Sequence, residues 1–474
     1  MTPTHRIRRL TWRARAPTPA DAFALRALLR ERGDAVQEAL SSALDRVGAG
    51  DDVVHLPQLV LQLDAAELGD LAAGLEQRVE AAVNEALAKA LPDAPARGRG
   101  TAGEGRAASR QPSAVTRLGS LRHYLATGGL DWSLAGLSPE AVAATLQQAA
   151  IAAMPGSTTG LHAALLAVLG SDDTTPAALS ALVRWLRLLP AHQRRVWVVS
   201  QRPRGVLAGL TDIVDAETPA VVELQALWLL GSQAANPAAP LSAAVVRWLR
   251  DALQTASLPA SLRGVAAGVG DTLSRALGAP AASDEGDALI RPTAPAPADL
   301  PATDASMLVP LAGLVLLHPY LPRLFTACGL WSHGERSIAL QALPRACTLL
   351  HGLACGGSEA PEFDLPLVKL LLGLPPEAPL RHAPAALSDA DRTEATALLE
   401  AVCAHWTALR GTGIDGLRLS FLQRRGLLDR REGAWHLRLQ TEPFDMLLGL
   451  LPWSISPIRL PWMTEPLTTD WPTP

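Results

Sequence analysis

The sequence contains few aromatic residues and almost no lysine. Only 4% of its 474 residues are aromatic although 48% are hydrophobic, so its cores must be built mainly from Ala, Leu and Val. Such small aliphatic side chains favour closely packed helices. Lys89 and Lys369 are the only lysines, and the net charge is −4. Neither nucleic acid nor an anionic membrane is therefore expected as a partner.

Cysteine is scarce as well and is confined to the last third of the chain. The four positions are Cys328, Cys347, Cys355 and Cys403. This placement is typical of buried or idle thiols in a reducing cytoplasm, not of a disulfide scaffold. The Arg-rich N-terminus has no apolar segment of the kind found in secretory signals. The longest apolar run, 308–317, is about half of the roughly 20 residues that a membrane span needs. A cytoplasmic protein without a membrane span is expected.

The motifs of the common catalytic and cofactor sites are missing. The sequence has no Gly-x-x-x-x-Gly-Lys-Ser/Thr, no His-Glu-x-x-His, no Gly-x-Ser-x-Gly and no Cys-x-x-Cys. With only two lysines, phosphate chemistry would have to depend on Arg alone. The chain is therefore not expected to be an enzyme, and no catalytic residue, cofactor or metal is assigned to it.

The best metal candidate is the helical spacing of Cys347, His351 and Cys355. At about 1.5 Å of rise per residue the outer two lie roughly 12 Å apart, whereas metal–ligand bonds are only about 2.0–2.3 Å long. At most one adjacent pair could share a zinc ion, helped by Cys328 or His318. A buried helix face that carries small apolar thiols is the preferred interpretation.

Two further polar pairs have a chemical and a structural interpretation. His318 and Tyr320 could form a catalytic pair, but a turn between two core helices is favoured. Glu362 and Asp364 could act as paired carboxylates, but they precede an apolar run, where acidic groups stabilise a helix N-terminus. The helix-stabilising role is predicted for both acids. The Arg-rich strand 6–15 could bind an acidic partner, and a solvated edge strand is preferred.

The first 91 residues predict a small α+β domain with the order β-α-β-α. A strand over 6–15 precedes one helix that runs from Pro17 to Gly48. A second strand over 53–63 precedes a second helix that ends near residue 91. Residues 92–113 are mainly Pro, Ala, Arg, Gly and Ser, and we interpret them as a flexible linker.

Residues 114–277 predict a series of helices separated by Pro or Gly, each of about 12–18 residues. Trp185, Trp228 and Trp248 each fall within a helical pattern, which favours stacked helical hairpins and allows a solenoid. Residues 278–303 form a second linker, rich in Pro and Ala.

Residues 304–474 predict a helical C-terminal domain with one β-hairpin. Helices are expected over 308–317, 320–328, 335–354, 364–372, 388–409, 414–424 and 443–450. Ser388 and Asp391 have the spacing of a capping box. Alternation over 427–439 predicts a hairpin that turns near Gly433. The predicted fold class is mainly α with small β elements in a multi-domain chain.

The C-terminal tail repeats Leu-Pro-Trp at 451–453 and 460–462, nine residues apart. So much apolar surface cannot be left in water, so the tail docks either on the body of the protein or on a partner. Extended, Pro-spaced segments with aromatic anchors are common at interfaces. We predict a partner-docking surface and keep a lid over the core as the alternative. Its residues are Leu451, Pro452, Trp453, Ile455, Leu460, Pro461 and Trp462.

Several segments resemble the contractile injection system tape measure protein family. In the order of that family they are 312–325 (AGLVLLHPYLPRLF), 367–376 (LVKLLLGLPP), 404–409 (AHWTAL), 416–426 (GLRLSFLQRRG) and the double Leu-Pro-Trp tail. Residues 5–63 and 118–132 are similar to its N-terminal elements, more loosely. Residues 138–303 contain no matching segment.

The resemblance implies a component of a phage-tail-like contractile apparatus, in which a sheath surrounds an inner tube on a baseplate. It implies a non-enzymatic assembly protein that helps to set the length of tube and sheath. The implied partners are inner-tube, tube-initiator, cap or baseplate proteins, met in the cytoplasm during assembly or in the particle. The alternative is a helical scaffold or chaperone-like adaptor that recruits baseplate, tube or cargo components. We hypothesise that the terminal domains dock to partners while the middle supplies spacing.

Overall fold

The computed structural model divides the chain into two compact units. Unit 1 comprises Met1–Gly119 with Ala135–Leu137, and unit 2 comprises Ser120–Leu134 with Ser138–Pro474. The structure describes residues 7, 16, 18–47, 52–56, 59–63, 68–90, 109–134, 137–154, 176–200, 222, 225, 226 and 306–471, the last range without 358–359, 379, 381–386, 410 and 432. The fold is mainly helical with small β elements, as predicted. The domain boundaries drawn from the sequence stay predictions.

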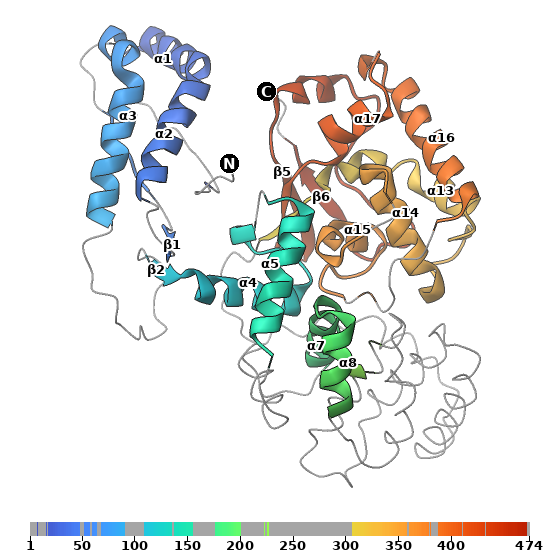
Figure 1. Ribbon diagram of the computed structural model, residues 1–474. Helices are drawn as coiled ribbons and strands as arrows, with labels where there is room; N and C mark the ends of the chain where they lie inside the picture. Colours follow the sequence, from blue (N-terminus) through green and yellow to red (C-terminus); the bar gives the residue numbers. More distant parts are fainter. Residues whose placement is uncertain are drawn as a thin grey trace, which may run out of the picture. The chain divides into compact units, whose positions relative to one another are not determined.

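Unit 1 is built around two packed helices (Figure 1). Its helices are α1 (Pro19–Glu31), α2 (Gly33–Val47) and α3 (Leu68–Ala90). Val36 and Leu40 of α2 are buried with Leu75 and Val79 of α3 in one apolar cluster. The single helix predicted from Pro17 to Gly48 is wrong, because the chain leaves the helical path at the C-cap of α1 and begins a second helix.

A two-stranded antiparallel sheet completes the described part of unit 1. Strand β1 (Asp52–His55) pairs with β2 (Ser109–Pro112). The predicted strand over 53–63 is therefore shorter than expected. Strand β2 occupies the end of the range 92–113 that composition assigns to a linker, because pairing with β1 supplies the hydrogen bonds that composition does not reveal. The predicted strand over 6–15 lies, apart from residue 7, outside the described residues.

The first part of unit 2 is helical. Its elements are α4 (Ser113–Thr127, shared with unit 1), η1 (Trp132–Leu134), α5 (Pro139–Ala152), α7 (Pro176–Leu188) and α8 (Ala191–Ser200). Trp185 of α7 is fully buried, donates its indole N–H to the carbonyl of Ala150 at 3.1 Å, and lies 5.6 Å from the ring of Trp197. These helices therefore pack around one tryptophan. Trp228, Trp248 and the predicted solenoid lie outside the described residues.

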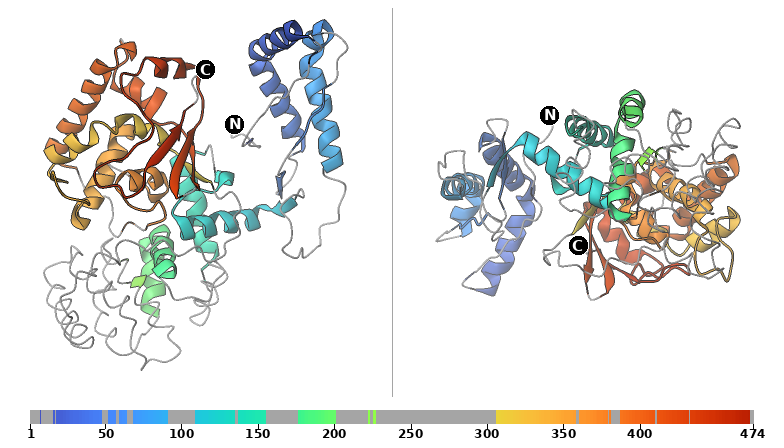
Figure 2. Two further views of the ribbon diagram at one scale, coloured as in Figure 1. Left: turned by 180° about the vertical axis from the view of Figure 1, so that it is seen from behind. Right: turned by 90° about the horizontal axis from the view of Figure 1, so that it is seen from below.

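The C-terminal part of unit 2 places helices against a four-stranded sheet. Its elements are β3 (Met307–Val309), η6 (Ala312–Leu317), α13 (Leu321–Ala327), η7 (Leu340–Ala342), α14 (Leu343–Cys355), η8 (Glu362–Asp364), α15 (Pro366–Leu371), α16 (Asp389–His405), η9 (Thr407–Leu409), α17 (Ile414–Leu417), η10 (Arg418–Leu422), β4 (Gly426–Arg431), β5 (Ala434–Leu439), η11 (Pro443–Leu450) and β6 (Leu467–Asp470). The strand order is β3-β4-β5-β6, with only the β5–β6 pair parallel. Figures 1 and 2 show α13 to α16 gathered on one side of this sheet.

Local signals in this region predict structure well where no distant partner intervenes. The hairpin β4–β5 turns at Gly433, whose φ is +81°, and the Ser388–Asp391 capping box is present. The helix predicted over 308–317 is wrong, because β3 pairs with β4 and a 3₁₀ helix follows. The helix predicted from 335 begins only at Leu343, because Pro344 fits the first turn of a helix and not its interior.

Candidate docking surface at the C-terminal tail

The second Leu-Pro-Trp copy is part of the hydrophobic core. Trp462 is 3% exposed, stacks on Phe325 with ring centroids 5.0 Å apart, and meets the ring of Trp331 edge-on at 5.1 Å. Its indole N–H donates to the carbonyl of Leu371 at 2.7 Å. Leu371 ends α15, so the tryptophan satisfies one of the carbonyls that a helix end leaves unpaired.

The tryptophan of the first Leu-Pro-Trp copy makes the same kind of hydrogen bond at the edge of the core. Trp453 is half-buried and donates its indole N–H to the carbonyl of Leu316 in η6 at 3.0 Å. Its ring lies 5.4 Å from Tyr320 and 5.2 Å from His405, and the Tyr320 hydroxyl lies 2.6 Å from His405 Nδ1. The favoured interpretation of Tyr320 as part of a turn fits its position between η6 and α13.

The remaining predicted docking residues divide by exposure. Leu460 is buried, Leu451 and Ile455 are half-buried, and Pro452 and Pro461 are exposed. After the second copy the chain enters β6, which pairs with β5 at the edge of the sheet. The tail thus covers the core of unit 2, which was the alternative kept above. Docking by these seven residues stays a prediction, and only the two prolines among them are exposed.

Two of the segments that carry the family resemblance pack against others through glycine. A Cβ at Gly313 would lie 1.8 Å from the carbonyl oxygen of Phe421, so main chain of η6 touches main chain of η10. Gly373 has φ +78°, and a Cβ there would lie 2.6 Å from the carbonyl oxygen of Trp462. The segments 312–325, 367–376 and 416–426 and the tail therefore form one packed assembly.

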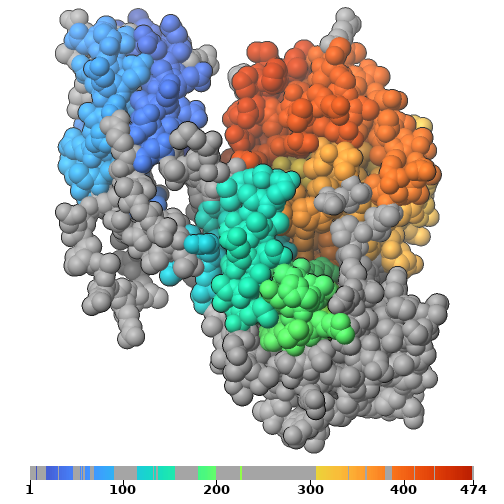
Figure 3. Space-filling model, in the orientation of Figure 1, coloured from blue at the N-terminus to red at the C-terminus, as the bar shows by residue number. Residues whose placement is uncertain are grey.

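Three of the large apolar side chains exposed in the described part of this region lie just before the tail, on η11. Phe444, Met446 and Leu450 are 57%, 67% and 66% exposed. The sequence interpretation assigned this stretch only a helical segment. The sequence could have predicted this surface. Residues 443–451 contain only one charged side chain, and they carry more apolar surface than one helix face can bury. In Figure 3 the red C-terminal residues form part of the outer surface of unit 2.

The inner side of η11 is fixed to the body of unit 2 by a buried ion pair. Asp445 is fully buried and accepts a hydrogen bond from Arg424 Nη2 at 2.9 Å. The same carboxylate accepts the main-chain N–H of Glu442 at 2.8 Å, which closes a capping box at the start of η11. The three exposed side chains are therefore presented by a rigid element. We define Phe444, Met446, Leu450 and Pro452 as the η11 surface.

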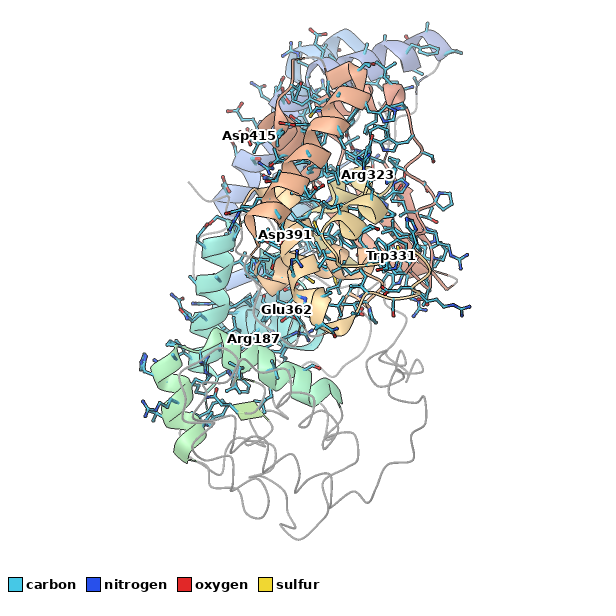
Figure 4. The ribbon with its side chains drawn as sticks, turned by 90° about the vertical axis from the view of Figure 1, so that its right-hand side faces the viewer. Arg187, Arg323, Trp331, Glu362, Asp391 and Asp415 are labelled. Carbon is cyan, nitrogen blue, oxygen red and sulfur yellow. The ribbon has the colours of Figure 1, made fainter. Side chains whose placement is uncertain are left out.

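A buried charge cluster joins α7 to the C-terminal helices of unit 2. Glu362 Oε1 lies 2.9 Å from Lys369 Nζ and 3.0 Å from Arg184 Nε. Its Oε2 lies 3.6 Å from Arg187 Nη1, and Figure 4 labels Glu362 and Arg187. Burial raises the pKa of Glu362, but the three cations outweigh it and hold the pKa at about 2. Glu362 and Asp364 form η8 directly before α15, so their predicted role at a helix N-terminus stays a prediction; neither caps α15 through its side chain, and Glu362 also forms these ion pairs.

Arg184 of this charge cluster also donates hydrogen bonds to main-chain carbonyls of other segments. Its guanidinium donates to the carbonyls of Leu125 and Ala126, at 2.8 and 3.2 Å, and to that of Glu377 at 2.6 Å. Gly128 is required beside it, because its φ is +71° and a Cβ would lie 2.9 Å from Arg184 Nη2. The cluster is therefore structural and holds three separate segments together.

The described residues contain no group of three His, Cys, Asp or Glu side chains placed to hold a metal ion. Cys347 and Cys328 are buried, which raises the pKa of each thiol to about 12. Within the same described ranges, no helix has the length and apolar character needed to cross a bilayer.

Comparison with known families gives one match. The family described as contractile injection system tape measure protein matches residues 4–471, nearly the whole chain. No match was found among curated proteins or among solved structures.

Proposed function

The chain belongs to the contractile injection system tape measure protein family, and on that premise we propose that it helps to set the length of the inner tube and sheath. Membership gives a structural role in assembly of the injection particle. The family match over residues 4–471 is the single observation that carries the finer proposal. Inner-tube, tube-initiator, cap and baseplate proteins are the proposed partners, met in the cytoplasm during assembly.

The proposal assigns length and docking to different parts of the chain. As one helix, the whole chain would span about 700 Å at about 1.5 Å per residue. The 38 prolines and 37 glycines do not permit such a helix, and the C-terminal part of unit 2 is packed around its own core. We therefore assign spacing to the middle region and docking to the ends.

Deleting residues 231–277 is expected to shorten the inner tube, because this deletion removes spacing residues while α7, α8 and the C-terminal part remain. Tube length in assembled particles is measured by electron microscopy. A matched variant replaces the same residues by a Gly/Ser segment of equal length. Assembled particles with tubes of unchanged length in the deletion variant would contradict the assignment.

Loss of the whole protein distinguishes the length-setting role from the adaptor alternative. A length-setting protein leaves particles of wrong or variable length when it is absent. An adaptor that recruits baseplate, tube or cargo components leaves particles that are missing or empty.

For docking, we propose that the η11 surface binds an apolar face on a tube or baseplate component. Three large apolar side chains that are more than half exposed within seven residues are unusual on a protein that works alone. Their element is held by Arg424 and Asp445, so binding costs little ordering of the main chain. Pro452 of the predicted docking segment continues the same surface along the chain.

The triple variant Phe444→Ser, Met446→Gln, Leu450→Gln is expected to fold normally and to be missing from purified particles. The side chains contribute little to the core because they are exposed, so the melting temperature should change by at most a few degrees. Incorporation is measured by immunoblotting of particles. Val196→Thr removes an equally exposed apolar side chain on α8 and serves as the control. Normal incorporation of the triple variant would refute docking through η11.

A further inference from the structure

Three aromatic side chains from distant segments meet at the surface of the C-terminal part of unit 2. Tyr320 directly precedes α13, His405 ends α16, and Trp453 follows η11. The ring centroids of Tyr320 and His405 lie 6.3 Å apart, and they lie 5.4 and 5.2 Å from that of Trp453. His405 is exposed and the other two are half-buried, so the three rings form a cluster that a partner can reach.

Hydrogen bonds hold this cluster and leave one ring nitrogen of His405 for a partner. Trp453 donates to the carbonyl of Leu316 at 3.0 Å, and the Tyr320 hydroxyl lies 2.6 Å from His405 Nδ1. Nε2 of His405 has no hydrogen-bond partner among the described residues. This nitrogen carries a hydrogen in the imidazolium and in the neutral form that accepts the tyrosine O–H at Nδ1. His405 can therefore donate from Nε2, and the rings need little further ordering on binding.

Arg323 supplies the only formal charge of the segments that surround the cluster. Residues 318–327, 401–409 and 446–458 contain no other Asp, Glu, Lys or Arg. Arg323 follows Tyr320 by three residues on α13, a spacing that places neighbouring side chains on one side of a helix (Figure 4). It is exposed and forms no ion pair with another residue that the structure describes. One unpaired cation on an otherwise uncharged surface is complementary to an acidic group of a partner.

The cluster is continuous with the η11 surface. Trp453 directly follows Pro452, and η9, which begins two residues after His405, packs against η11. Tryptophan, tyrosine and arginine are also the residue types that most often dominate binding energy at protein interfaces. The two surfaces can therefore be covered by one partner.

We propose that Tyr320, Arg323, His405 and Trp453 bind an acidic residue within an apolar protein segment. That segment belongs to the tube or baseplate component that covers the η11 surface, so this inference rests on the docking role proposed above. The Arg323 guanidinium pairs with the carboxylate, for which its planar set of donors is suited. His405 donates from Nε2 to an oxygen of the same segment, and the rings of Trp453 and Tyr320 supply the apolar contact.

The test is the charge reversal Arg323→Glu in the full-length chain. Its amount in purified particles, measured by immunoblotting, is expected to fall about ten-fold, because two like charges would then face each other. Arg323→Lys keeps the charge and should retain most of the incorporation. Arg336→Glu makes the same change at an exposed arginine outside the cluster and serves as the control. Native incorporation of Arg323→Glu, or an equal loss with Arg336→Glu, would overturn the inference.

Two readouts keep this test separate from folding and from the η11 proposal. Arg323 is exposed and unpaired, so the melting temperature of Arg323→Glu should change by at most a few degrees. Loss of the η11 triple variant from particles together with native incorporation of Arg323→Glu would overturn only the acidic contact. Native incorporation of the triple variant together with loss of Arg323→Glu would refute docking through η11 and support the cluster.

Discussion

Replacing Trp462 by alanine is expected to remove a large part of the stability of the C-terminal part of unit 2. The change removes the stack on Phe325, the edge contact with Trp331 and the hydrogen bond to Leu371, and it leaves a large cavity. Large-to-alanine changes of buried aromatic residues cost about 3–5 kcal/mol, against a total stability of about 5–15 kcal/mol for a typical domain. Urea denaturation followed by tryptophan fluorescence or circular dichroism measures the loss.

The neighbouring residues supply graded controls. Pro461→Ala, at the exposed position before Trp462, should change the unfolding free energy by less than about 0.5 kcal/mol. Trp453→Ala should lower the unfolding free energy by an amount between these two, because the Trp453 side chain is half-buried and donates one hydrogen bond. A Trp462→Ala protein with the denaturation midpoint of the native chain would show that the tail is not part of the core. The docking test above uses η11 because a variant without Trp462 would lose folding and docking together.

The tail illustrates what the sequence can and cannot decide. Its composition correctly requires burial, because two tryptophans and several leucines cannot remain in water. Composition does not say what buries them. The acceptor for Trp462 lies 91 residues away in the chain and that for Trp453 lies 137 away, so only the fold brings each pair together.

The same distinction separates the correct from the incorrect secondary-structure predictions. The hairpin at Gly433 and the capping box at Ser388 are specified within a few residues, and both were predictable. The strand β3 was not, because its apolar residues fit a buried helix equally well until they pair with β4, more than 100 residues later. The local sequence pattern determines a secondary-structure element only where the residues that pair with that element are close to it in the sequence.

The ion pairs of Glu362 could not be predicted for a similar reason. An acid just before an apolar run is the ordinary sign of a helix N-terminus, and Lys369 alone did not change that interpretation. The partner that defines the cluster, Arg184, is 178 residues away. One hint was present: Lys369 is one of only two lysines, and it falls within the apolar run 365–374, where a cation must be paired. A charged residue in a buried stretch predicts an oppositely charged partner, but it does not show which residue that partner is.

Replacing Glu362 by glutamine is expected to destabilise unit 2 by about 3–5 kcal/mol, because removal of one partner leaves buried charges uncompensated. Lys369 and Arg184 are both 0% exposed, so two buried cations would lose the carboxylate that they share, and Arg187 would lose one partner. Glu465→Gln breaks an exposed pair with Arg430 and should cost less than about 1 kcal/mol. Adding Lys369→Met to the Glu362→Gln protein should recover part of the loss, since it removes one unpaired cation.

Acid titration separates this ion-pair role from simple packing. An unfolded glutamate has a pKa of about 4.3, whereas the pKa of Glu362 in the folded chain is about 2, so the folded chain binds the proton less readily. The stabilisation is complete above about pH 4.5 and is lost as the pH falls toward 2. The denaturation midpoint of the native chain should therefore fall more steeply over this range than that of the Glu362→Gln variant. Parallel slopes would show that the carboxylate contributes by shape alone, and a variant as stable as the native chain would show that the cluster does not hold α7 in place.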